Sequence, residues 1–152
     1  MGTRNLVAVY AGDASLRVVL GPQVRAFTSE GMKTFLSSEY KVTPASDRMG
    51  IRLSGPAIEH RSDSDIVTDA TVGGAIQVPG DGQPILLLAD RQTTGGYAKI
   101  AAVITADLDR AGQLRPGDRV RFLPVDIEEA HRAYHEYLAK LGRLRSGLPG
   151  HV

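Results

Sequence analysis

The chain has 152 residues, a net charge of +1 at neutral pH and no cysteine. Its length suits one domain with a core of its own, and the lack of cysteine excludes thiol catalysis, cysteine zinc sites and disulfides. Because charges of both signs are interspersed and aromatic residues make up only 5% of the chain, we expect neither a nucleic-acid partner nor a membrane partner.

Short apolar runs separated by glycine and proline predict a strand-rich domain. The first run, at 6–10, is too short for a signal-peptide core, and no run approaches the roughly 20 residues of a spanning helix, so we expect a soluble, cytoplasmic protein. The number and spacing of the runs suggest a barrel or a sandwich. The candidate strands are 6–10, 16–20, 49–53, 66–68, 75–78, 85–89, 101–104 and 119–125.

Two helices are expected among these strands. Thr28 or Ser29 can cap a short helix that ends before the segment 40–42. The apolar period then changes at Asp126, which predicts an amphipathic helix from about Ile127 to Leu144. We therefore divide the chain into an N-terminal strand segment at 1–15, a barrel at 16–125, a C-terminal helix at 126–145 and a flexible tail at 146–152.

The segment richest in chemical groups follows the apolar run at 85–89. Asp90 can act as a base or orient Arg91, while Thr93, Thr94 and the amides of Gly95 and Gly96 can donate to an oxyanion. Gln92 and Tyr97 add an amide and a phenol. The alternative is an ordinary solvated turn. The composition of Gly80–Gly82 predicts a hairpin turn that joins the strands carrying Gln77 and Ile85.

A second polar pattern lies around residue 50. Strand alternation places Arg48, Gly50 and Arg52 on one face. Two guanidiniums separated by a glycine predict a clamp for a carboxylate or phosphate, with Gly50 keeping the space between them open. The alternative is that Arg48 pairs with Asp47 or a loop carboxylate and faces water.

Metal and nucleotide motifs are weak or missing. Glu128, His131 and His135 have a spacing that can chelate a metal on a helix. Their order is not H-E-x-x-H and no further ligand is apparent, so structural histidines are favoured and we predict no metal site. Neither G-x-x-x-x-G-K-[ST] nor G-x-G-x-x-G occurs, so no cofactor is bound through a recognisable motif.

Several longer motifs, in order, resemble one family. They comprise 16–18 with 21–23, 46–56, 74–79 through 92–97, and 112–113 with 116–122. Together they are similar to the C-terminal half of the family often labelled allophanate hydrolase subunit 2. That family includes KipA, the C subunit of bacterial 5-oxoprolinase, and part of the carboxyltransferase domain of urea carboxylase. The resemblance covers about residues 16–130.

The resemblance implies a mainly β (β-rich α+β) fold, a cyclophilin-like β-barrel with a short helix and a C-terminal helix. It also implies a complex with a KipI-like subunit and a LamB/YcsF-type subunit that opens 5-oxoproline to glutamate with ATP, or carboxyl transfer from biotin to urea. ATP or biotin would then act at the level of the complex. The alternatives are a KipA-like, non-enzymatic regulator that binds a KipI-like kinase inhibitor, and a stand-alone cyclophilin-like isomerase.

Under the leading interpretation, the polar segments form one pocket. The predicted catalytic residues are Asp90, Arg91, Thr93 and Thr94. The predicted substrate-binding residues are Arg48, Arg52, Gln77, Gln92, Gly95, Gly96 and Tyr97. Family members usually carry a preceding half, whereas about fifteen residues precede the matching region here, so a site formed between two halves would be incomplete.

Overall fold

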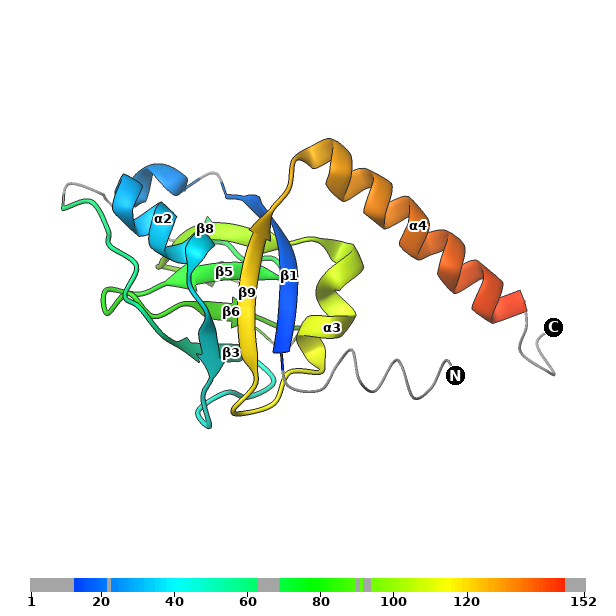
Figure 1. Cartoon of the computed structure of the whole chain (residues 1–152), viewed down its shortest axis with the longest axis horizontal. Helices are drawn as coiled ribbons and strands as arrows, with labels where there is room; N and C mark the ends of the chain where they lie inside the picture. Colours follow the sequence, from blue (N-terminus) through cyan, green and yellow to red (C-terminus); the bar gives the residue numbers. More distant parts are fainter. Residues whose placement is uncertain (1–12, 22, 63–68, 90, 92–93, 147–152) are drawn as a thin grey trace.

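The computed structural model describes residues 13–21, 23–62, 69–89, 91 and 94–146. The predicted strands at 6–10 and 66–68 lie outside these residues. Within the described ranges the dominant feature is a closed barrel of short strands, from which one long helix projects (Figure 1).

Seven strands close the barrel in the order β1-β8-β5-β6-β3-β2-β9. Six of the pairings are antiparallel, and β1 with β9 is parallel. An odd number of strands cannot alternate all the way round a circle, so one parallel seam is required. The strands are β1 (Asp13–Leu20), β2 (Tyr40–Val42), β3 (Gly50–Ser54), β5 (Ala75–Val78), β6 (Ile85–Leu87), β8 (Ala98–Val103) and β9 (Arg119–Pro124).

This barrel confirms the β-rich fold and the positions of the strands predicted at 16–20, 49–53, 75–78, 85–89, 101–104 and 119–125. The strand expected at 85–89 ends at Leu87, and the one expected at 101–104 begins earlier, at Ala98. The predicted turn between β5 and β6 is confirmed: Gly82 has a φ of 78°, and its N–H donates to the Pro79 carbonyl at 2.9 Å. That left-handed conformation favours glycine.

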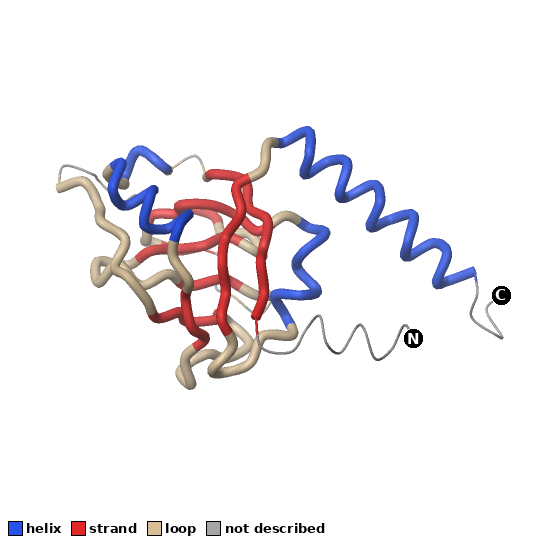
Figure 2. Tube along the Cα trace, in the orientation of Figure 1, coloured by secondary structure: helices blue, strands red, loops and turns tan. Residues whose placement is uncertain are grey.

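The helices lie outside the barrel (Figure 2). Helix α2 (Ser29–Ser37) follows the 3-10 turn η1 (Val24–Ala26), and the hydroxyl of Thr28 accepts from Gly31 N at 2.9 Å as its cap. This confirms the predicted short helix. The 3-10 turn η2 (Thr105–Asp107), helix α3 (Leu108–Gly112) and a small ribbon of β4 (Asp69–Ala70) with β7 (Thr94–Gly95) were not expected.

The C-terminal helix α4 (Ile127–Ser146) confirms the prediction and runs away from the barrel (Figure 1). It is attached near its middle, where Ala133 is buried and the Tyr137 hydroxyl donates to Asp109 Oδ2 at 3.0 Å. None of the described helices has the length and apolar content to cross a membrane.

The barrel interior is filled by side chains from every strand and from α2. Phe35 of α2 stacks on Phe122 of β9 with ring centroids 4.7 Å apart, and both are buried with Leu16 and Val18. Tyr40 is also fully buried, and its hydroxyl donates to the Pro56 carbonyl at 2.9 Å. Burial raises the pKa of Tyr40 to about 12. The interior is therefore a packed core.

One partly buried ion pair joins β1 to the unexpected η2–α3 segment. Asp107 is only 3% exposed. Its carboxylate accepts from the backbone N–H of Arg17 at 2.8 Å and from the Arg17 guanidinium at 3.0 and 2.7 Å. This hydrogen bonding outweighs burial and raises the pKa of Arg17 above its usual value. The contact fixes the segment that follows β8 against the barrel.

Candidate functional site

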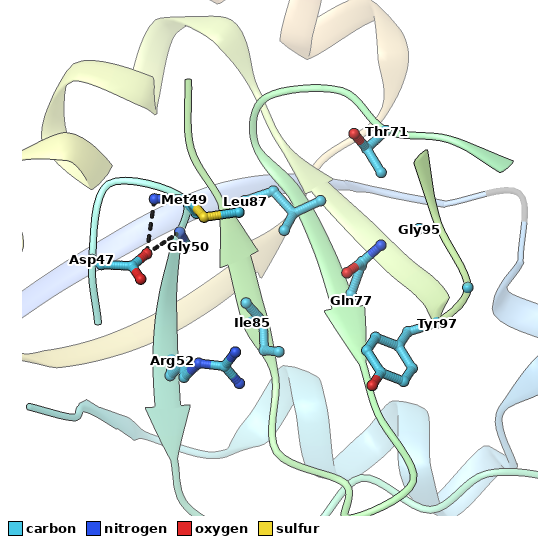
Figure 3. A pocket seen from close by; sticks show the side chains of 11 residues that line it. Asp47, Met49, Gly50, Arg52, Thr71, Gln77, Ile85, Leu87, Gly95 and Tyr97 are labelled. Carbon is cyan, nitrogen blue, oxygen red and sulfur yellow. Dashed lines mark hydrogen bonds between the residues drawn. The ribbon is translucent and has the colours of Figure 1, made fainter. Parts of the chain in front are cut away.

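A polar cavity of about 320 Å³ opens on the outer surface of the barrel, over β3, β6 and β5 (Figure 3). The segment around β7 closes it on the side opposite β3. The cavity brings together five of the predicted binding residues: Arg52, Gln77, Gly95, Gly96 and Tyr97. It also includes Asp47, Met49, Gly50, Thr71, Ile85 and Leu87, which were not among the predicted catalytic or binding residues.

The turn into β3 holds the Arg52 side of this cavity. Asp47 Oδ1 accepts from the backbone N–H groups of Met49 at 2.8 Å and Gly50 at 3.2 Å, as Figure 3 shows. The backbone N–H of Arg52 in turn donates to Ser46 Oγ at 2.9 Å. Within the described residues the Arg52 guanidinium has no hydrogen bond or ion pair, so it is available to an anion in the cavity.

The two arginines of the predicted clamp line different cavities. Arg48 lies with Arg91 on a second, mostly apolar cavity of about 480 Å³, which shares Leu87 with the first. Gly50 does not keep a space open between Arg48 and Arg52, because a Cβ at Gly50 would lie 2.9 Å from Ile85 Cγ2. Ile85 comes from β6, whose pairing with β3 was not apparent from the local alternation.

Arg91 is held by backbone carbonyl groups. Its Nη1 donates to the Ala89 carbonyl at 3.3 Å and its Nη2 to the Thr71 carbonyl at 3.5 Å, whereas its buried Nε has no acceptor. Arg91 lines the second cavity and is hydrogen-bonded to the backbone of Thr71, which lines the polar cavity. Asp90, Gln92 and Thr93 lie outside the described residues, and for Thr94 only the backbone, in β7, is described.

Gln77 is the predicted residue with the most unusual surroundings. It is 6% exposed, and its Nε2 is buried without an acceptor. The amide packs directly against Gly95, where a Cβ would overlap Nε2. A buried amide donor without a partner is costly. The close approach explains a glycine at position 95, and the unpaired donor points to a ligand oxygen.

Sequence reasoning did not select Lys99 as a site residue. Its side chain is only 8% exposed, and its Nζ has no hydrogen-bond partner in the described structure. Lys99 is the cross-strand neighbour of Gln77 in the β5–β8 pairing. The signal that could have identified it was the pairing register, which local sequence does not supply.

No group of three or more histidine, cysteine, aspartate or glutamate residues in the described ranges could hold a metal ion. Glu128, His131 and His135 lie on the projecting helix α4. The donors of the polar cavity, a guanidinium and an amide, suit an oxygen-bearing anion or carbonyl compound rather than a cation.

Comparison with known proteins gives this geometry a context. The family model described as carboxyltransferase domain, subdomain A and B, matches residues 2–124. The chain is 35% identical over 130 residues to the C subunit of 5-oxoprolinase from Escherichia coli, covering 82% of this chain and 42% of that protein. It is 37% identical over 132 residues to the Haemophilus influenzae protein of the same name, covering 85% and 43%. The chain thus spans less than half the length of these relatives.

Solved structures agree with the sequence comparison. The Kluyveromyces lactis urea carboxylase matches with a TM-score of 0.81 and 28% identity, covering 92% of this chain and 14% of that chain. The urea amidolyase of K. lactis matches with a TM-score of 0.78 and 30% identity, covering 84% and 8%. The barrel is therefore shared with one part of these larger proteins.

Proposed function

The chain belongs to the carboxyltransferase-domain family, subdomains A and B, and on that basis we propose that it is a component of a 5-oxoprolinase-type complex. In this role it binds a small carboxylate or amide substrate in the polar cavity and orients it. The reaction is the ATP-dependent opening of 5-oxoproline to glutamate. Two relatives that are named as the C subunit of 5-oxoprolinase support this choice of activity.

The observation that carries the proposal is the unpaired Gln77 amide in the same cavity as the Arg52 guanidinium. Both groups can donate hydrogen bonds, and a carboxylate or lactam oxygen would satisfy both. A volume of about 320 Å³ lies at the lower end of the range usual for small-molecule pockets. Gly95 and Gly96 line the same cavity, and the lack of a side chain at Gly95 makes room for the Gln77 amide.

The proposed chemistry needs more than this cavity. We assign ATP to the assembled complex, with a KipI-like subunit and a LamB/YcsF-type subunit as partners in the cytoplasm. Asp90, Thr93 and Thr94 keep their proposed catalytic roles, Asp90 as base or orienting group and the two threonines as donors to the carbonyl oxygen, and Gln92 keeps its proposed binding role. Arg91 and Arg48 line the second cavity, so their proposed catalytic and binding roles require a ligand that extends past Leu87, which both cavities share.

The test is a reconstituted complex of this chain with its genomic neighbours, assayed for 5-oxoproline-dependent ATP hydrolysis. Arg52→Ala should lower kcat/KM by roughly 10- to 100-fold, the value of a hydrogen bond from a charged group. Arg25→Ala is the matched control, because Arg25 is an exposed arginine on η1, away from the cavity. If Arg52→Ala has the kcat/KM of the wild type, the cavity has no part in the reaction. Asp90→Asn is assayed in the same way, and an unchanged kcat/KM would refute the role of Asp90 as base.

A second candidate is carboxyl transfer to urea, which is favoured by the TM-score of 0.81 with a urea carboxylase. The same preparation, supplied with a carboxylated biotin carrier and urea, would distinguish the two reactions by which substrate is consumed. A chain that binds the KipI-like partner but supports neither turnover would favour the KipA-like regulator.

A further inference from the structure

Four side chains form one row across the outer surface of the barrel. Lys99 of β8 pairs with Gln77 of β5, Gln77 pairs with Ile85 of β6, and Ile85 pairs with Arg52 of β3. Directly paired residues point to the same face of a sheet. The residues before and after them in these strands, including Ile51, Leu86, Ile76 and Ile100, are buried in the core, so this row faces outward.

The row has a distinct chemical order: cation, amide, apolar group, cation. With strands about 4.8 Å apart, the Cα atoms of Lys99 and Arg52 lie about 14 Å apart, with Gln77 and Ile85 between them. Both end residues have side chains long and flexible enough to extend toward the middle of the row. Gln77, Ile85 and Arg52 line the polar cavity, and Lys99 lies one strand beyond it.

The Lys99 and Gln77 end of the row carries the buried polar groups that lack hydrogen-bond partners. Lys99 and Gln77 are each more than nine-tenths buried, and Nζ of one and Nε2 of the other lack partners in the described structure. A buried ammonium without a counter-charge is more costly than an unpaired amide, because it loses its hydration without compensation. An anionic oxygen at this end would satisfy both groups.

We propose that this cross-strand row is a binding platform and that Lys99 is a further binding residue. The ligand is a small carboxylate that also carries an amide or ureido group. Its carboxylate binds the Lys99 ammonium, its amide lies at Gln77, its apolar part rests on Ile85, and its far carbonyl oxygen meets Arg52. This inference rests on the proposed function and specifies how its substrate lies.

The experiment uses the full chain and two probes, 5-oxoproline and its neutral amide, measured by calorimetric titration. Lys99→Met removes the charge and keeps the length. Lys41→Met is the matched control, because Lys41 is an exposed lysine on strand β2. Lys99→Arg tests rescue by a second cation.

The wild-type chain should bind 5-oxoproline at least about tenfold more tightly than the neutral amide. Lys99→Met should lose roughly 10- to 100-fold in affinity for 5-oxoproline and little for the amide, as expected for a hydrogen bond to a charged group. Lys41→Met should match the wild type, and Lys99→Arg should recover part of the affinity. Without ligand, Lys99→Met should melt at the same temperature or higher, since an unpaired buried charge is gone.

Equal affinity of wild type and Lys99→Met for 5-oxoproline would overturn the inference. So would a wild-type chain that binds neither probe or does not distinguish them, or a lower melting temperature in ligand-free Lys99→Met. The proposed function is judged separately by turnover. If the complex turns over 5-oxoproline equally well with wild type and with Lys99→Met, the proposed function stands and the role of Lys99 is refuted. If binding depends on Lys99 but the complex shows no turnover of 5-oxoproline, the binding role stands and the proposed function is refuted.

Discussion

The contact between Gly95 and Gln77 gives a quantitative test of how the cavity is built. Gly95 has a backbone conformation that any residue can adopt, so Gly95→Ala perturbs the site only by its added methyl group. That methyl would overlap Gln77 Nε2 and lie 3.3 Å from Thr71 Cγ2. Because Nε2 is the far end of a flexible side chain and makes no hydrogen bond, the amide can move aside, so we expect a cost of about 1 kcal/mol of folding free energy, at the lower end for crowding of this kind. The move would take the amide out of the position in the cavity that Figure 3 shows.

A double-mutant cycle separates this steric effect from other effects of the substitution. In a Gln77→Ala background the overlapping amide is absent, so Gly95→Ala should cost little or stabilise the fold by about 0.5 kcal/mol through the reduced entropy of the unfolded chain. Urea denaturation of the four proteins should therefore give a coupling free energy of about 1 kcal/mol. Additivity within about 0.5 kcal/mol would refute the proposed packing.

Three further predictions concern the framework. Asp107→Asn should lower the free energy of unfolding by about 2 kcal/mol in urea titrations, because it removes charge-assisted hydrogen bonds to the partly exposed Arg17; a loss below about 1 kcal/mol would contradict this. Tyr40 has its pKa raised to about 12 in the folded state, against about 10 when unfolded, so its contribution to stability is complete below pH 10 and is lost as the pH rises toward 12. Urea titrations at about pH 9 and about pH 11 should therefore show a larger alkaline loss for wild type than for Tyr40→Phe, and equal losses would count against it. Thr28→Ala should cost about 1 kcal/mol by removing the cap of α2, whereas Thr28→Ser should cost much less; thermal melts of the two variants check this.

The elements that could be predicted from the sequence are those with a local, repeated signal. Alternating burial along β1, the Thr28 cap and the apolar period of α4 are properties of neighbouring residues, and the structure has each of them. The strands of the β4–β7 ribbon have two residues each, too few to show a period. Helix α3 has five residues and is fixed partly by Asp107, whose partner is 90 positions away.

The candidate site shows the same limit. Gln77, Gly95 and Arg52 could be selected because they lie in or beside recognisable motifs, but their relation to one another depends on strand register. Local alternation predicted that Gly50 is a spacer between two arginines, but the pairing of β3 with β6 places Ile85 against it. Lys99 lies in a strand whose residues are nearly all buried, so no alternation marked which face it occupies.

The parallel seam between β1 and β9 has a practical consequence for engineering the chain. Its register runs from Asp13 with Arg119 to Val18 with Pro124, so β1 starts at one rim of the barrel and β9 finishes at the other. A circular permutant that joined the end of β9 to the start of β1 would need a linker able to span the length of six paired residues, about 20 Å along the strands. Fluorophores attached at the two points would sit at opposite rims, and a change in energy transfer between them would report the barrel opening along its seam.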